Sequence, residues 1–295
     1  MRLDDENESS NFEIQDGRGS QAGFGGGGGL GLIGMIVPFV FSRFGCGGLV
    51  VLGLVVLVFG GLGNIGSMLS SGSTAPAPHS SSTPGQLTDI QRVSLRVLGS
   101  TERRWTEIFA TSNERYPAPT LSFFSGNGMS GCGAAQAAMG PFYCPADQKI
   151  YIDTRFFEEM KTRYNVPGDF PIGYVIAHEV GHHIQTIDGT AAKVQAAQAR
   201  ASRTQGNALQ VAMELQADCY AGVWAARDTN LLEAGDIEEG LAAAQAIGDD
   251  TLQRAAGQRP VPDSFTHGSA AQRQQWLRRG LESGDPRVCD TFQGR

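Results

Sequence analysis

The sequence predicts an α+β domain that is mostly helical and carries one small sheet. Apolar residues recur every three or four positions over several long segments, which is typical of helices. Runs with the length and composition of strands are few and short. These elements fall within residues 87–295, a length that can bury a full hydrophobic core, and no internal period indicates a repeat architecture.

Residues 1–43 are predicted to form a disordered tail that contains one short apolar segment. Residues 1–29 are acidic and polar and then rich in glycine, so they have little with which to build a core. The apolar run from Leu30 to Phe41 is too short to cross a bilayer alone. It could lie in the membrane interface or extend a longer, tilted span, and the sequence leaves both open.

Residues 44–69 are predicted to form one transmembrane helix, because they are almost uncharged and long enough to cross a lipid bilayer. A cleaved signal peptide would instead begin with basic residues and place its apolar stretch near the N-terminus. Arg2, Arg18 and Arg43 precede the span, whereas the next basic residue after it is Arg92. This bias predicts a cytoplasmic N-terminus and a C-terminal domain on the exported, periplasmic or extracellular side of the cell membrane.

Residues 70–86 are rich in Ser, Pro, Ala and Thr and carry no charge, which is typical of a flexible linker. The soluble domain is predicted to cover residues 87–295. Its elements follow in chain order: a helix at 88–112, strands at 121–124 and 149–153, a helix at 155–164, a helix at about 171–187, a weakly patterned helical segment at 191–205, and helices at about 207–227 and 270–281. Alternating polarity predicts that the strand at 149–153 is half buried.

His178-Glu179-Val180-Gly181-His182 is the most informative stretch of the chain. Two imidazoles four positions apart project from one face of a helix and can bind a single Zn²⁺, with a carboxylate beside it. A bound zinc ion lowers the pKa of its water to about 7, and the glutamate can accept and return protons. A buried helix with two merely hydrogen-bonded histidines is the alternative, but chance is a poor explanation for this order in a chain with five histidines.

A catalytic zinc site needs a third protein ligand and one open position. Glu214, in the stretch Met213-Glu-Leu-Gln-Ala-Asp218, is the candidate. Asp218 lies one helical turn later and could accept the free N–H of a zinc-bound histidine. An E-x-x-x-D pair on an exposed helix is common and uninformative. This helix is rich in apolar and aromatic neighbours, so it is predicted to be buried, where unpartnered carboxylates are costly.

These motifs resemble those of the gluzincin metallopeptidases, the thermolysin-like group, in which HExxH is followed by a helical E-x-x-x-D. Longer phrases resemble more closely the neutral zinc metallopeptidase family of bacterial membrane-anchored proteins. They are Cys132-Gly133, Gly140-Pro-Phe-Tyr-Cys144-Pro-Ala-Asp-Gln-Lys-Ile-Tyr, Ile176-Ala-His-Glu-Val-Gly-His-His-Ile-Gln and Glu214-Leu-Gln-Ala-Asp-Cys-Tyr-Ala-Gly. The resemblance covers roughly residues 87–295. It implies a zincin-like fold with one catalytic zinc ion held by His178, His182 and Glu214, and it says little about substrate.

The same resemblance points to His267 and Arg273. In gluzincin-like enzymes a histidine downstream of the glutamate ligand often donates a hydrogen bond to the developing oxyanion. His267 stands just before the helix predicted to start at Ala270, and Arg273 could contact the same charge in the transition state. An ordinary helix start with two solvated side chains is the alternative. His183 points away from the face of His182 and is predicted to play a structural part.

Four of the five cysteines lie after the predicted span, as structural disulfides in an oxidising compartment would. Three pairings are possible. We favour Cys132–Cys144, which would close a Gly-rich loop, and Cys219–Cys289, which would tie the C-terminal segment to the glutamate helix. Cys46 falls in the span and is predicted to be an isolated thiol. Metal ligation by cysteine is disfavoured, because no C-x-x-C occurs.

The predicted function is zinc-dependent hydrolysis of peptide bonds in a peptide or protein substrate, with Glu179 as general base and then as proton donor. The strand segment Ile150–Asp153 is predicted to form the upper edge of the cleft and to pair with an extended peptide, although simple core packing would also explain it. The chain carries 30 acidic and 23 basic residues, so it offers no basic patch suited to nucleic acid. Oligomeric state is not predicted.

Two alternatives come from other classes of protein. In a membrane-tethered scaffold or chaperone the zinc would be structural, but such a site would need a fourth protein ligand and would have no use for Glu179. A hydrolase of a non-peptide amide of the cell envelope would use the same residues as a peptidase, and the sequence does not separate these two enzymes.

Overall fold

The computed structural model describes residues 1–15, 87–166 and 168–292. The apolar run 30–41, the predicted transmembrane helix 44–69 with Cys46, and the linker 70–86 lie outside these residues. Within the described parts of the chain, no helix is both long and apolar enough to cross a membrane.

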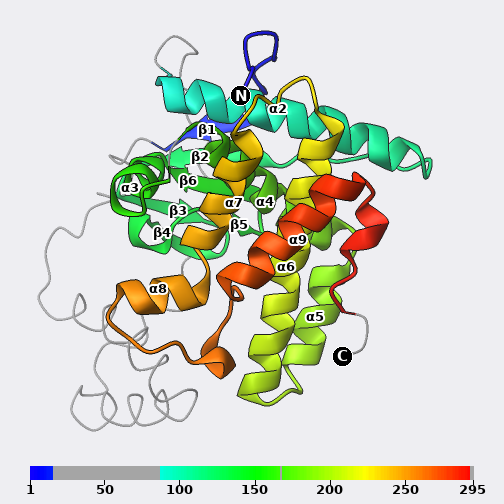
Figure 1. Cartoon of the computed structure of the whole chain (residues 1–295). Coiled ribbons are helices and arrows are strands. Elements are labelled where there is room, and N and C mark those ends of the chain that lie inside the picture. Colours follow the sequence, from blue (N-terminus) through cyan, green and yellow to red (C-terminus); the bar gives the residue numbers. More distant parts are fainter. Residues whose placement is uncertain (16–86, 167, 293–295) are drawn as a thin grey trace, which may run out of the picture. The chain divides into compact units, whose positions relative to one another are not determined.

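The described residues form an α+β domain with eight α-helices and two small sheets, which confirms the predicted class (Figure 1). Three helices begin with a capping box, in which a Ser or Thr and a Gln three residues later satisfy free backbone N–H groups. Helices α7 and α8 had not been predicted. The helices are α2 (Asp89–Ala110), α3 (Arg155–Arg163), α4 (Phe170–Ile187), α5 (Thr190–Gln198), α6 (Arg203–Arg227), α7 (Asp236–Ala246), α8 (Asp249–Ala255) and α9 (Ala270–Ser283).

The larger sheet has the strand order β1 (Phe12–Ile14), β2 (Thr120–Phe124), β6 (Lys149–Asp153) and β5 (Phe142–Cys144). The β1–β2 and β2–β6 pairs are parallel, and β5 runs antiparallel to β6. The prediction that β6 is half buried and forms an edge is wrong, because β2 and β5 flank it and only its first residue is not buried. Strand β5 is the edge strand instead.

Strands β3 (Asn127–Ser130) and β4 (Gly133–Gln136) form a separate hairpin inside the predicted cysteine loop. A disulfide joins Cys132, at the turn of this hairpin, to Cys144 at the end of β5, with a Cα–Cα distance of 5.8 Å. A second disulfide joins Cys219 in α6 to Cys289 in the short 3₁₀ turn η4 (Pro286–Cys289). Both favoured pairings are therefore present in the structure.

Residues 1–15 belong to this domain, which corrects the prediction of a disordered tail. Strand β1 pairs with β2 through Phe12, Glu13 and Ile14. The α-ammonium group of Met1 lies 2.8 Å from Asp169 beside the start of α4. Composition misled the prediction because the few apolar residues of the segment, among them Leu3, Phe12 and Ile14, pack on the core. Backbone hydrogen bonds and ion pairs of its acidic side chains with arginines of α2 add contacts that a count of apolar residues does not register.

The same strand pair bears on the predicted membrane topology. Hydrogen-bonded strands share one compartment, so the pairing of β1 with β2 places residues 12–14 on the same side as the rest of the sheet. The predicted span lies outside the described residues, so the predicted membrane topology is not tested and stays a prediction.

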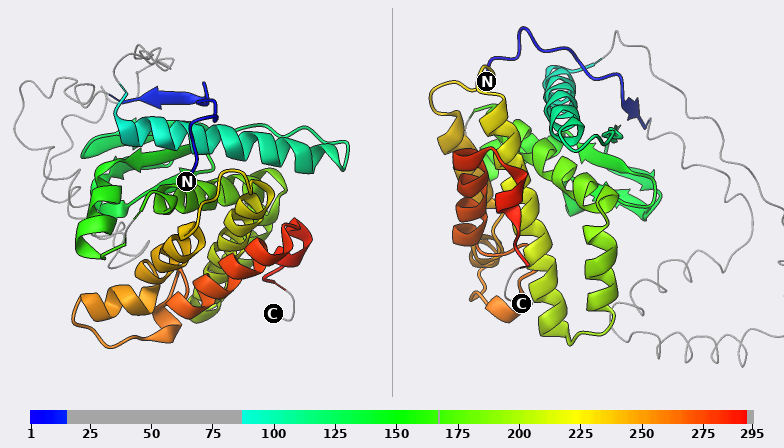
Figure 2. Two further views of the ribbon diagram at one scale, coloured as in Figure 1. Left: turned by 45° about the horizontal axis from the view of Figure 1, so that its top comes forward. Right: turned by 90° about the vertical axis from the view of Figure 1, so that its right-hand side faces the viewer.

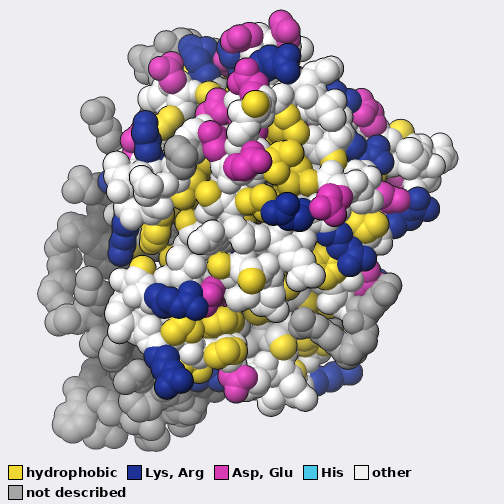
Figure 3. All heavy atoms as spheres, in the orientation of Figure 1, with side chains coloured by type: hydrophobic (Ala, Val, Ile, Leu, Met, Phe, Trp, Pro, Cys, Tyr) yellow, Lys and Arg dark blue, Asp and Glu magenta, His cyan; other side chains and the backbone are white. Residues whose placement is uncertain are grey.

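The helices cover the sheet and bring α4 to the centre of the fold. Helix α4 contacts β5 and β6 of the sheet together with α2, α6 and α7, and α6 packs along α9. Figure 2 shows α5 and the first half of α6 as adjacent helices that extend beyond the rest of the helical layer. On the face drawn in Figure 3, basic and acidic side chains are interspersed among apolar ones, so that face carries no broad field of one sign.

Candidate active site

Helix α4 carries the HExxH residues in the interior of the domain. It begins after the N-cap residue Asp169, with Pro171 in its first turn, where the missing N–H of proline costs nothing. Gly189 follows its end in a left-handed conformation (φ 81°), which glycine adopts without strain. Most of the helix is buried, so its few polar side chains must find partners within the domain.

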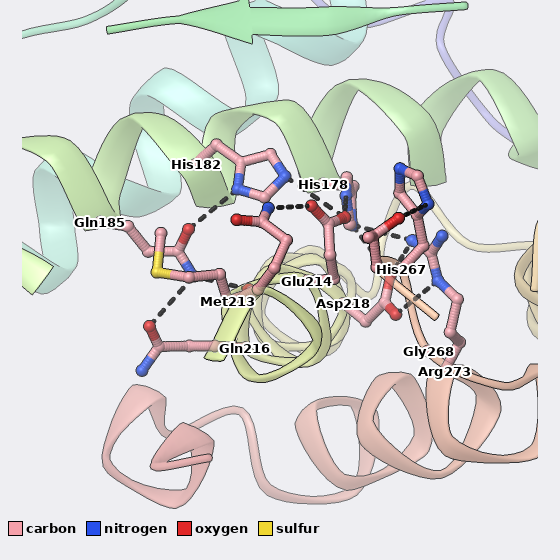
Figure 4. A network of polar contacts seen from close by, with 12 residues as sticks. His178, His182, Gln185, Met213, Glu214, Gln216, Asp218, His267, Gly268 and Arg273 are labelled. Atoms are coloured by element: carbon pink, nitrogen blue, oxygen red, sulfur yellow. Dashed lines mark hydrogen bonds and ion pairs between the residues drawn. The ribbon is translucent and has the colours of Figure 1, made fainter. Parts of the chain in front are cut away.

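The three predicted metal ligands converge at one point (Figure 4). Oε2 of Glu214 lies 3.2 Å from Nε2 of His178 and 3.6 Å from Nε2 of His182. Zinc bonds of about 2.0–2.1 Å in a tetrahedron place neighbouring ligand atoms roughly 3.3 Å apart. The spacing of these atoms and the set of two imidazoles with one carboxylate therefore fit a catalytic zinc ion.

Close contact between α4 and α6 makes this convergence possible. A Cβ atom on Gly181 would lie 2.9 Å from the Cα atom of Ala217 and 3.1 Å from its carbonyl oxygen. Such contacts are shorter than carbon atoms tolerate, so the glycine in HExxH sets the distance between the helices. Glu214 lies one turn before Ala217 on α6. The short distance between α4 and α6 therefore brings its carboxylate close to the two imidazoles. No role had been predicted for Gly181.

Asp218 holds the ring of His178 from behind. Its Oδ1 atom lies 2.8 Å from Nδ1 of His178 and accepts a 2.6 Å hydrogen bond from the hydroxyl of Tyr174. Two nitrogen atoms of Arg273 donate to the two oxygens of the same carboxylate, each at 2.9 Å. Arg273 is buried, and this ion pair occupies its guanidinium, so its predicted contact with the transition state stays a prediction.

Glu179 stands beside the ligand cluster with part of its carboxylate unengaged. It is 6% exposed, and its Oε2 atom has no hydrogen-bond partner among the residues that the structure describes. Burial raises the pKa of Glu179, although the nearby histidines oppose the rise. A buried, unpartnered carboxylate is costly to a fold, and a base with a raised pKa accepts protons more readily near neutral pH.

The ligand cluster opens into a cleft of about 1100 Å³. Strand β5 contributes Phe142 and Tyr143 to its wall, and α5 contributes Val194. The wall of the cleft therefore combines these apolar and aromatic side chains with polar ones, and residues of β5 form part of it.

His267 also lines the cleft and is held by Asp249. Nδ1 of His267 lies 3.2 Å from Oδ1 of Asp249, and Oδ2 of Asp249 accepts the backbone N–H groups of Thr266, His267 and Gly268 at 2.7, 2.6 and 3.0 Å. The hydrogen bond to Asp249 raises the pKa of His267, against the effect of partial burial. Asp249 was not predicted, because its only signal in the sequence is a pair of aspartates at the start of the short helix α8.

His183 contacts the sheet instead of the metal site. Its Nδ1 atom lies 3.0 Å from the hydroxyl of Tyr143 on β5, and its Nε2 atom contacts the carbonyl oxygen of Pro117. Burial lowers the pKa of His183, so the ring is held neutral. His183 thereby ties the zinc helix to the edge strand, which agrees with a structural part.

Comparison with known proteins decides the family. The model of a family described as "Putative neutral zinc metallopeptidase" matches residues 1–292. The chain belongs to this family. It is 44% identical over 296 residues to the uncharacterized protein YpfJ of Escherichia coli K12, with 99% of both chains covered. It is 43% identical over 190 residues to the uncharacterized protein Rv2575 of Mycobacterium tuberculosis, covering 60% of this chain and 63% of the relative. No solved structure matches.

Proposed function

We propose that this protein is a zinc-dependent metallopeptidase that hydrolyses peptide bonds in extended segments bound along β5. The observation that carries the proposal is the meeting of two imidazoles and a carboxylate at zinc-ligand spacing beside Glu179, a buried and unpartnered carboxylate, within one cleft. Membership of a zinc metallopeptidase family supports the same reaction.

Each residue of the site has a part in this reaction. His178, His182 and Glu214 would hold the ion, which when bound supplies Lewis-acid activation of water and of the scissile carbonyl. Glu179 accepts a proton from the attacking water and delivers it to the leaving amine. His267, held by Asp249, donates a hydrogen bond from Nε2 to the oxygen on which negative charge develops.

Strand β5 is suited to orient the substrate. Among the described residues it pairs only with β6, so its other edge offers unpaired N–H and C=O groups to an extended chain. Phe142 and Tyr143 of this strand line the cleft, and their distance from Glu179 is constrained by the contact of Tyr143 with His183 on α4.

A structural zinc site in a scaffold protein is less well supported. Among the described residues, no fourth His, Cys, Asp or Glu joins the group formed by His178, His182 and Glu214. A structural site is normally closed by a fourth protein ligand and has no need of an unpartnered carboxylate such as Glu179.

The location of the protein is also part of the proposal. Two disulfides favour an oxidising compartment outside the cytoplasm for the domain. Attachment to the cell membrane through residues 44–69 rests on their apolar composition. Because β1 pairs with β2, this attachment would have to keep residues 12–14 on the same side of the bilayer as the domain, so residues 44–69 would not cross it as a single span.

A Glu179→Gln variant tests the reaction. The native protein and the variant should bind equal zinc, but only the native protein should cleave members of a peptide library, with turnover of the variant lower by at least about 10³-fold. Equal turnover by both proteins would remove Glu179 from the mechanism. Cleavage of cell-envelope amides by the native protein without cleavage of any peptide would favour the non-peptide amidase.

A further inference from the structure

A chain of amide side chains stands behind His182, on the side away from the proposed metal. Gln185 lies three residues after His182 on α4 and is fully buried. Its Oε1 atom lies 2.9 Å from Nδ1 of His182 (Figure 4). Its Nε2 atom donates to the carbonyl oxygen of Met213 at 2.7 Å and to Oε1 of Gln216 at 3.0 Å, and both of these acceptors are on α6.

Backbone carbonyl groups fix the direction of every bond in this chain. The carbonyl of Met213 can only accept, so Gln185 must present its nitrogen to α6 and its oxygen to His182. Gln216 is fixed in the same way, because its Nε2 atom donates to the carbonyl oxygen of Cys289 at 3.0 Å. The oxygen of Gln185 then requires a proton on Nδ1 of His182, so the neutral form of this ring has its lone pair on Nε2.

The end of this series of hydrogen bonds that lies away from His182 is anchored covalently. Cys289 is joined to Cys219 of α6 by a disulfide, and Gln216 lies one turn before Cys219 on the same helix. The two imidazoles of the site are thus oriented by different chemistry: Asp218, a carboxylate, faces His178, whereas an uncharged amide faces His182.

We propose that Gln185, supported by Gln216 and the carbonyl of Cys289, is a positioning residue that selects the zinc-binding tautomer of His182. Through Met213 it also fixes the part of α6 that presents Glu214, the next residue along the chain. The inference rests on the zinc site of the proposed function but not on peptide hydrolysis. Loss of such a ligand-orienting contact typically weakens metal binding by about 10–100-fold.

The test uses full-length protein and the variant Gln185→Met, which keeps the length of the side chain and removes both polar ends. Zinc affinity is measured by competition with a chelator, and ¹⁵N NMR of the zinc-free protein, at a pH high enough for the ring to be neutral, reports which nitrogen of His182 carries the proton. We expect the zinc dissociation constant to rise about 10–100-fold and the single Nδ1–H form of His182 to give way to a mixture. Gln216→Met should act in the same direction but less strongly.

Gln274→Met is the matched control. Gln274 also ties two helices together, since its Nε2 atom donates to the carbonyl oxygen of Leu241 at 2.9 Å, but it contacts no imidazole. This variant should leave zinc affinity and the His182 tautomer unchanged. The double variant of Gln185 and Gln216 should lose less affinity than the two single losses combined, because both residues belong to one chain of bonds.

Two results would overturn the inference. One is a Gln185→Met protein that keeps the Nδ1–H form and binds zinc within about twofold of the native protein. The other is a Gln274→Met protein that loses as much zinc affinity as the Gln185 variant. If Gln185→Met does not fold, Gln216→Met decides the matter, because Gln216 contacts no ligand. Native protein that binds zinc but cleaves no peptide would overturn the proposed activity and leave this inference intact.

Discussion

Replacing Gly181 with alanine tests whether the contact between α4 and α6 sets the geometry of the zinc site. The added methyl group would lie 2.9 Å from Cα and 3.1 Å from Cβ of Ala217. Ordinary carbon contacts are about 3.5–4.0 Å, so the helices must separate by roughly 0.5–1 Å. Because the clash is with backbone, no side-chain rotation relieves it.

The separation should weaken zinc binding more than it weakens the fold. Overpacking of this kind costs about 1–3 kcal/mol of unfolding free energy. Functional metal sites keep ligand distances within about 0.2 Å, and Oε2 of Glu214 now lies 3.2 Å from Nε2 of His178 and 3.6 Å from Nε2 of His182. A shift of about 0.5 Å in Glu214 exceeds that tolerance, so we expect the dissociation constant for zinc to rise at least about tenfold.

Urea unfolding of the zinc-free protein and chelator competition measure the two effects separately. Gly206→Ala on α6 is the control, since no atom lies within 4 Å of the position its Cβ would take. That variant should gain about 0.5–1 kcal/mol of stability from the better helix propensity of alanine, with unchanged zinc affinity. Native zinc affinity in Gly181→Ala would refute the claim that this contact sets the ligand geometry.

Three further predictions concern other parts of the molecule. Asp249 raises the pKa of His267, and only the imidazolium form of His267 carries N–H on both nitrogens. The variant Asp249→Asn should lower this pKa and so move the alkaline limb of the pH profile of kcat/KM to lower pH. An unmoved limb would exclude His267 as the hydrogen-bond donor. Replacing Cys132 and Cys144 by serine should cost about 3 kcal/mol in urea unfolding, given their separation of 12 residues, and native stability would contradict the bond. Deleting residues 2–15 should lower the melting temperature and promote association of the protein through the uncovered edge of β2. A deletion variant that stays monomeric with native stability would contradict the conclusion that β1 is part of the sheet.

The candidate site was predictable because its residues are tied to fixed helical spacing. His178 and His182 share a helical face by their separation of four residues, and Glu214 and Asp218 do so on the second helix. What the sequence could not supply is the contact between the two helices, since Gly181 and Ala217 are distant along the chain and neither is a metal ligand. Asp249 was missed for the same reason, because its contact with His267 joins residues 18 positions apart. Gln185 lies on the helix of His182, but its anchoring to Met213 and Gln216 on α6 is a tertiary contact.

The helices of the fold were predicted better than its strands. Long helices such as α2 and α6 carry caps and many turns of periodic pattern, whereas β5 and β1 contain only three residues each. Strand β6 was located correctly, but alternation of residue types did not reveal that its neighbours on both sides make it an interior strand. Edge and interior positions depend on pairing between distant segments, which one sequence does not show.

Strand β1 joins the N-terminal segment, which had been predicted to be disordered, to the sheet beside the candidate active site. Glu13 of β1 forms a 2.7 Å ion pair with Lys149 of β6, and Gln15 accepts the backbone N–H of Met129 on β3 through its side chain. The N-terminal segment thus contacts the sheet whose other edge, β5, lines the cleft. A substitution such as Glu13→Lys should therefore weaken the sheet, whereas Asp4→Lys, at a position with no resolved ion pair among the described residues, should not. Equal stability of both variants in urea would show that β1 contributes little to the sheet.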